Sequence, residues 1–108
     1  MAISIEQFAE VQLRTALVKE ATRVEGTDRL LKLKISLGSE ERQIVAGIGQ
    51  HYEPEALVGR TVVVVANLAP ATIRGVESNG MMLVASSGGR LALLTPDGGD
   101  FPPGAVVR

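Results

Sequence analysis

The stretch Leu31-Lys32-Leu33-Lys34-Ile35-Ser36-Leu37 carries the clearest structural pattern in this sequence of 108 residues. Its odd-numbered residues are all Leu or Ile, and its even-numbered residues are Lys, Lys and Ser. Alternation with a period of two is typical of a β-strand that buries one face and exposes the other. The stretch therefore predicts a half-buried strand with a basic outer face.

Further strands are predicted on both sides of this stretch. Residues 13–23 show no helical periodicity and hold Thr and Val at alternate places, which favours a strand. Residues 61–67 are β-branched and apolar, as expected for a strand that is covered on both faces. The remaining predicted strands are residues 42–46, after a turn at residues 38–40, a last pair at residues 81–85 and 90–94, and an edge strand at residues 105–107.

Two short helices complete the pattern. Ser4 and Gln7 have the spacing of a capping box, so residues 4–9 are expected to form one or two helical turns. Pro54 stands at a favoured first-turn position, which predicts a second short helix over residues 54–57.

The order of these elements decides the fold class. After the short N-terminal helix come three strands, a short helix and two further strands. This order of strands and helix is that of an OB fold. We therefore expect an all-β, five-stranded barrel with a short helix between strands 3 and 4. Residues 69–80 and 96–103 contain Pro and Gly and are expected to be loops. A chain of 108 residues has room for one hydrophobic core, so residues 1–108 are expected to be a single domain.

The composition indicates a soluble protein of a reducing compartment. The chain has no cysteine, so neither disulfides nor thiolate metal sites are available. Residues 1–4 lack the basic start and the apolar region of a secretory signal. The longest aliphatic run, residues 62–66, is far shorter than the roughly 20 residues of a membrane helix. We therefore expect a cytoplasmic protein without a membrane segment.

The charge balance argues against strong, non-specific binding of a polyanion. Eleven basic residues stand against twelve acidic ones, which gives a formal net charge of -1. Non-specific binding of nucleic acid depends on neutralisation of phosphates by Lys and Arg. Aromatic residues make up 3% of the chain, too few for a platform that stacks single-stranded bases.

No group of residues has the pattern of an active site. His51 is the only histidine, which is too few for most catalytic metal sites and leaves no second imidazole to activate a serine. Beside Tyr52 at a helix start, it is expected to cap or to pack. Gly47-Ile48-Gly49 lacks the third glycine and the Lys-Ser/Thr of a phosphate loop, and is expected to let the backbone turn. We therefore expect no enzymatic activity, no bound metal and no cofactor.

Two clusters of polar residues are candidates for binding. The first surrounds the basic strand, and is either a solvated outer face or a track for phosphates, which lysine binds as a point charge. The second surrounds the loop after the apolar strand, where Asn and Ser either cap the loop or contact another molecule that approaches the small residues. These clusters are Arg29, Lys32 and Lys34, and Asn67, Arg74 and Ser78.

Six stretches, spread over nearly the whole chain, carry a family resemblance. They are VQLRTALV at residues 11–18, EGTDRLLKL at 25–33, RQIVAGI at 42–48, YEPEALVGR at 52–60, VANLAP at 65–70 and RGVESNGMML at 74–83. In this order they resemble the tRNA-binding domain at the C-terminus of many bacterial methionyl-tRNA synthetases. The same domain occurs as free-standing tRNA-binding proteins and in eukaryotic synthetase cofactors related to the EMAP-II cytokine.

The resemblance implies an OB fold, a homodimer and recognition of tRNA by shape. The expected target is the outer corner of the tRNA, where the D and T loops meet, so the anticodon plays no part. Such a domain is a non-catalytic accessory, either to a methionyl-tRNA synthetase catalytic domain or within the same protein. Shape recognition and contacts to 2′-hydroxyls need no aromatic platform. By position, the implied tRNA contacts are Arg29, Lys32 and Lys34 to phosphates, Asn67 and Ser78 by hydrogen bonds, Arg74, and Met81 against a base.

The sequence departs from the family at Ala71 and Thr72, where relatives commonly carry one or two basic residues. Together with the net charge of -1, this predicts weaker and more salt-sensitive tRNA binding than in a basic relative. The implied dimer agrees with apolar residues near both ends, which a small barrel cannot cover. These are Ile3, Ile5, Phe8, Phe101, Val106 and Val107.

Two alternatives remain open at this point. A related branch of the same fold comprises export chaperones that bind proteins or peptides, and a nearly neutral surface suits that function too. The other alternative is a purely structural dimerisation domain, in which the basic face binds nothing.

Overall fold

The longest strand, β1 (Leu13–Arg23), pairs with different neighbours along its two halves. Its first half is antiparallel to β4 (Thr61–Val65) and its second half to β2 (Leu31–Ser36). The β1–β2 register shifts between Val18 and Glu20, and an irregularity of this kind bends a strand. The bend allows one strand to belong to both sides of a curved sheet.

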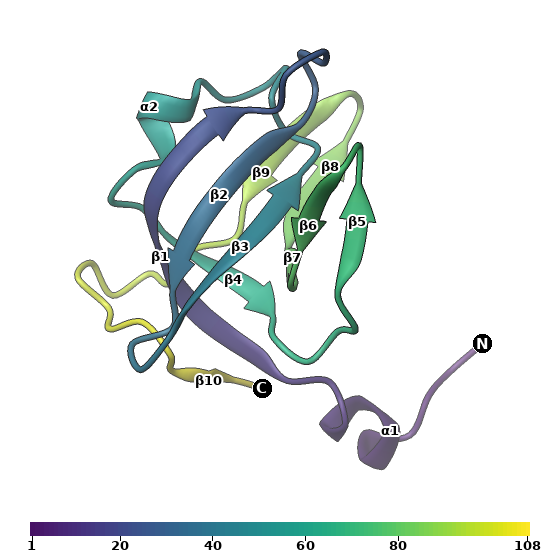
Figure 1. Cartoon of the computed structure of the whole chain (residues 1–108). Coiled ribbons are helices and arrows are strands. Elements are labelled where there is room, and N and C mark those ends of the chain that lie inside the picture. The colour runs from purple at the N-terminus through teal and green to yellow at the C-terminus, as the bar shows by residue number, and fades with distance from the viewer.

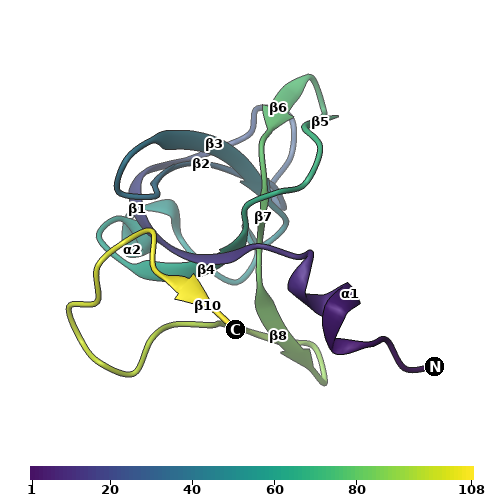
Figure 2. The ribbon, with the colours of Figure 1, turned by 90° about the horizontal axis from the view of Figure 1, so that it is seen from below.

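The computed structural model, which describes residues Met1–Arg108, curls this sheet into a nearly closed barrel (Figures 1 and 2). The strand order is β3-β2-β1-β4-β7, with β3 at Glu41–Ala46 and β7 at Met81–Met82. At the seam, the backbone N–H of Asn79 donates a hydrogen bond of 2.8 Å to the carbonyl of Gln43. The predicted five-stranded barrel of the OB type is confirmed.

The side chains of β2 show the alternation that the sequence predicts. Leu31, Leu33 and Ile35 are at most 1% exposed and fill the barrel, whereas Lys32 and Lys34 are exposed on its outer face. Burial of each such aliphatic side chain stabilises the fold by roughly 1.5–3 kcal/mol.

The helix α2 (Pro54–Leu57) and the strand β4 also lie where the sequence predicts them. Leu57 is fully buried and belongs to the core of the barrel. Val62, Val63, Val64 and Val65 of β4 are all buried, as expected for a strand covered on both faces.

The segment 69–80 differs from the prediction of a loop. It contains a hairpin of β5 (Ala71–Ile73) and β6 (Val76–Ser78), joined by the two-residue turn Arg74-Gly75. Both turn residues have positive φ, 53° and 79°, as in the two-residue turns that join hairpins. The first turn position usually holds Asn, Asp or Gly, and an arginine there conceals the hairpin in the sequence.

The strand expected at residues 81–85 is divided in the structure. Met81–Met82 forms β7 and pairs with β4, whereas β8 (Val84–Ser87) pairs with β9 (Arg90–Leu93) as a separate hairpin. Leu83 lies between the two strands, so the chain passes from the barrel into this hairpin within one residue. Periodicity does not reveal the division, because residues 81–85 are apolar throughout.

Both ends of the chain lie on one side of the barrel, near the start of β1 (Figure 2). The helix α1 (Ile5–Ala9) has the predicted capping box between Ser4 and Gln7, and none of its residues is buried. The predicted edge strand is β10 (Val106–Val107), which pairs with Leu13 and Arg14 of β1.

One arginine joins the edge of β3 to the end of β4. The Arg42 guanidinium donates hydrogen bonds to the carbonyl of Ala66 and to the Glu40 carboxylate, the latter at 3.2 Å. Hydrogen bonding and the positive charge of Arg42 lower the pKa of Glu40 below its usual value of 4.5. The charge of Arg14 contributes in the same direction.

Because its pKa is lowered by folding, Glu40 stabilises the fold above the unfolded-state pKa, and this stabilisation is lost as the pH falls through the lower folded-state pKa. We therefore expect Glu40→Gln to lower the urea midpoint at about pH 7 and to have a smaller effect at about pH 3. Glu55→Gln, at an exposed position without an ion pair, is the control and should change neither midpoint. If Glu40→Gln lowered the urea midpoint equally at both pH values, the stabilisation would not come from the ionised Glu40 carboxylate.

Candidate nucleic-acid interface

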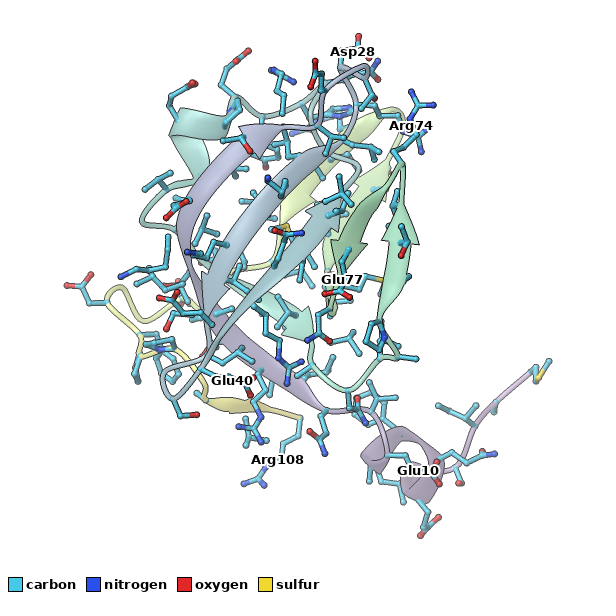
Figure 3. The ribbon with its side chains drawn as sticks, viewed as in Figure 1. Glu10, Asp28, Glu40, Arg74, Glu77 and Arg108 are labelled. Atoms are coloured by element: carbon cyan, nitrogen blue, oxygen red, sulfur yellow. The ribbon has the colours of Figure 1, made fainter.

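The loop between β1 and β2 is held in place by two arginines from other segments. Arg23 donates hydrogen bonds to the carbonyls of Asp28 (3.1 Å) and Gly49 (2.8 Å). Arg74, at the tip of the β5–β6 hairpin, donates one of 3.1 Å to the carbonyl of Gly26. Figure 3 shows Arg74 beside the part of this loop that carries Asp28. We call residues 24–30 the clamped loop.

The clamped loop presents Arg29 as an exposed cation. The Arg29 backbone N–H donates to Thr27 Oγ1, and its guanidinium forms no ion pair or hydrogen bond within the chain. It lies over the backbone of Gly47, where a methyl group would be 3.8 Å from Arg29 Nε. Arg29 is therefore placed by the backbone and keeps all five of its donors.

The two lysines on the outer face of β2 differ in their surroundings. Lys34 Nζ lies 3.7 Å from Glu20 and 3.9 Å from Glu41, whereas Lys32 takes part in no ion pair. Both lysines line one shallow polar cavity on the outside of the barrel, together with Thr22 and other residues of β1 and β3.

The β5–β6 hairpin extends this outer face beyond β3 (Figure 1). Gln43 Nε2 donates a hydrogen bond of 2.8 Å to the carbonyl of Glu77 on β6. Ser78 is 4% exposed, and its hydroxyl accepts a hydrogen bond of 2.9 Å from the Val45 N–H and donates to the carbonyl of Gly80. The structure therefore gives Ser78 a role in joining the hairpin to the barrel, and leaves little of it to contact another molecule.

Asn67 lies at the other end of the hairpin from Arg74, close to α1. Its Oδ1 accepts a hydrogen bond of 2.8 Å from the Gln12 N–H, and its Nδ2 donates to the carbonyl of Glu10 at 2.6 Å. Both ends of the amide thus hold the segment between α1 and β1. Asn67 is not brought together with the basic residues of the clamped loop.

Met81 is exposed and lines an apolar groove of about 200 Å³ at the seam of the barrel. Gly47 and Val45 line the same groove. Arg29 lies beside Gly47, and Val45 is the register partner of Lys32, so the groove adjoins both cations.

Of the seven predicted contact residues, four surround one part of the surface. Arg29 belongs to the clamped loop and Arg74 is hydrogen-bonded to it, Lys32 lies beside it on β2, and Met81 lines the groove. Lys34 lies two residues further along β2, next to the carboxylates of Glu20 and Glu41. The prediction from the sequence did not include Arg23, although a basic residue at the end of the strand before a turn was visible in the sequence.

His51 packs against the β8–β9 hairpin, with Nε2 3.3 Å from the carbonyl of Gly89. The neighbouring Tyr52 hydroxyl accepts a hydrogen bond of 3.3 Å from the Leu93 N–H. No three His, Cys, Asp or Glu side chains are grouped as metal ligands would be. None of the helices has the length and apolar character needed to cross a bilayer.

Residues 13–105 match the family described as "Putative tRNA binding domain", and the chain belongs to this tRNA-binding domain family. A methionine–tRNA ligase of Thermotoga maritima is 57% identical to the chain over 106 residues, and one of Methanothrix thermoacetophila is 52% identical over 106 residues. These matches cover 98% of the chain but only 17% and 16% of the respective ligases. The chain therefore corresponds to a small part of such an enzyme.

Solved structures share the whole fold. A MetRS related protein from Pyrococcus horikoshii has 36% identity and a TM-score of 0.94, with 100% of this chain and 99% of that chain covered. The chaperone CsaA from Bacillus anthracis has 27% identity and a TM-score of 0.89, with 100% of both chains covered. The same barrel thus occurs in relatives with different names.

The close packing of Gly49 generates a test of the clamped loop. A methyl group at Gly49 would lie 2.7 Å from the Asp28 carbonyl oxygen, nearer than such contacts allow. We expect Gly49→Ala to lower the free energy of unfolding by about 1–3 kcal/mol and to increase amide exchange in residues 24–30. Gly47→Ala is the matched control, because its methyl group would meet no atom nearer than 3.8 Å. If both variants lost the same free energy of unfolding, the clamped loop would not be held by the contact with Gly49.

Proposed function

We propose that the chain binds tRNA, without catalysis, by the shape of its outer corner, as an accessory module of or to a methionyl-tRNA synthetase. The observation that carries the proposal is the group of cations without a carboxylate partner around the clamped loop, on a barrel of the tRNA-binding domain family. The relatives that cover nearly all of the chain are methionine–tRNA ligases, which supports the synthetase as the partner.

The proposed contacts divide by chemistry. Arg29, Lys32 and Arg74 supply charges for phosphates, which position an RNA without reading its bases. Met81 and its groove offer an apolar surface to an exposed base. In this proposal Asn67 and Ser78 act as positioning residues, since their polar groups are hydrogen-bonded within the chain. With few cations that lack a carboxylate partner, the affinity is expected to be modest and to fall as the salt concentration rises.

The proposal includes a homodimer formed through the two ends of the chain. An apolar cavity of about 520 Å³ lies between α1 and β10, and is lined by Phe8, Val11 and Val107, among others. A helix of five residues is too short to be stable alone in water, and nothing in the chain buries α1. A second copy would cover this surface and place two RNA-binding faces in one particle, which raises the apparent affinity without new contacts.

Reversal of the charge of Lys32 tests RNA binding. We expect Lys32→Glu to weaken binding of unfractionated tRNA by at least roughly tenfold at about 50 mM salt, measured by gel shift or fluorescence polarisation. Arg60→Glu makes the same change of charge at an exposed arginine without an ion pair or side-chain hydrogen bond, and should leave the affinity within about twofold.

Several individual tRNAs are expected to bind with similar affinity, and an RNA hairpin without the outer corner more weakly. Lack of binding to any tRNA at about 50 mM salt would overturn the proposed function, because electrostatic binding is strongest at low salt. Equal effects of the two charge reversals would overturn the assignment of Lys32.

Disruption of the end-to-end surface tests the dimer. We expect Phe8→Asp to give a monomer in light scattering and to weaken tRNA binding by roughly tenfold or more. Val58→Asp, at an apolar residue that is 50% exposed elsewhere on the barrel, should remain dimeric. A wild-type chain that is monomeric at micromolar concentration would contradict this part of the proposal.

A second candidate function is binding of peptides, as the likeness to the CsaA chaperones suggests. The apolar surfaces at the seam and between the chain ends are the features that would serve it. Lys32→Glu separates the candidates, because it should leave binding of an uncharged peptide unchanged while binding of tRNA is weakened.

A further inference from the structure

The surroundings of Lys32 and Lys34 divide the outer face of β2 into two parts. On either side of Lys32, the register partners are Thr22 on β1 and Val45 on β3, and neither is charged. On either side of Lys34 they are Glu20 and Gln43, and Glu41 reaches it from the end of β3. The alternation in the sequence makes the two lysines look equivalent, but their neighbours on β1 and β3 differ.

Two carboxylates share the single charge of Lys34. The Nζ–Oε distances are 3.7 Å to Glu20 and 3.9 Å to Glu41, and the two acidic side chains are 70% and 50% exposed. Exposed ion pairs of this kind add little to the stability of a fold, about 0–1 kcal/mol. Their larger effect is on an approaching anion, because a phosphate at Lys34 would come close to both negative charges.

Further acidic residues lie on the same side of the molecule. Figure 3 shows Arg74 and the clamped loop at one end, and Glu77 and Glu40 further towards the other. Unlike charges across an interface direct an approaching partner, and like charges exclude it. Among the predicted contacts, Arg29, Lys32 and Arg74 form no ion pair and lie on or beside the clamped loop, which also carries the exposed carboxylates of Glu25 and Asp28.

We infer that Glu20 and Glu41 exclude phosphate from Lys34 and end the RNA-binding surface between Lys32 and Lys34. This inference rests on the proposed function and narrows its site: Lys34 is not an RNA contact in the wild-type chain. The two glutamates are specificity-determining residues, which confine the RNA to the surface around Arg29, Lys32 and Arg74.

The test compares neutral substitutions in a double-mutant cycle, with tRNA affinity measured by fluorescence polarisation from about 50 to about 200 mM KCl. Lys34→Gln alone should leave the affinity within about twofold, whereas Lys32→Gln should weaken it several-fold. The double variant E20Q/E41Q should bind roughly fivefold more tightly at low salt, with a salt slope steeper by about one phosphate contact.

The cycle is completed by adding Lys34→Gln to E20Q/E41Q, which should remove most of the gain in affinity. The control is E55Q/D97N, which makes the same change of net charge at two exposed carboxylates without ion pairs, and should bind as the wild type does. Unchanged thermal unfolding of each variant shows that the fold is retained.

The inference is overturned in either of two ways. If Lys34→Gln weakens binding as much as Lys32→Gln, Lys34 is an RNA contact. If E20Q/E41Q gains as much without Lys34 as with it, the glutamates act only through net charge. In both cases the wild type still binds tRNA and the proposed function stands. Absence of binding by every variant at low salt would instead overturn the proposed function, and this inference with it.

Discussion

The bend in β1 is the constraint on which the rest of the structure depends. This strand pairs with β4 over residues 13–17 and with β2 over residues 17–23, across the irregularity at residues 18–20, so the sheet curves until β3 and β7 approach each other. Closure places Leu31, Leu33 and Ile35 inside, which forces the lysines between them outward. The basic outer face is therefore a consequence of how the core is filled.

Most of the fold could be predicted from local patterns, because the alternation of buried and exposed positions in a strand appears in the sequence as alternation of apolar and polar residues. The bounds of β1 and α2 agree with the predictions, since period-two alternation and Pro54 are local signals. The β5–β6 hairpin was missed because its turn uses Arg74 at positive φ. The division between β7 and β8 was missed because the pairing partner of a strand is not a local property.

The sequence identified the charged residues of the site but not the ion pairs that they form. Arg29, Lys32 and Arg74 were identified by residue type and by resemblance, and the structure places them on or beside the clamped loop. The carboxylates beside Lys34 come from two other strands, at positions 14 residues before and 7 residues after it in the chain, so the alternation of β2 gives no sign of them. In the same way, only the folded chain reveals that the Asn67 amide is already hydrogen-bonded at both ends.

The hydrogen bonds of Asn67 have a mechanical consequence. They join the segment between α1 and β1 to the chain just after β4, so the N-terminal arm is held against the barrel. In an assembly built through that arm, the distance between the two binding faces would be a rigid property of the particle. Asn67 would then fix the distance between the two binding faces, which two bound molecules, or two parts of one molecule, must match.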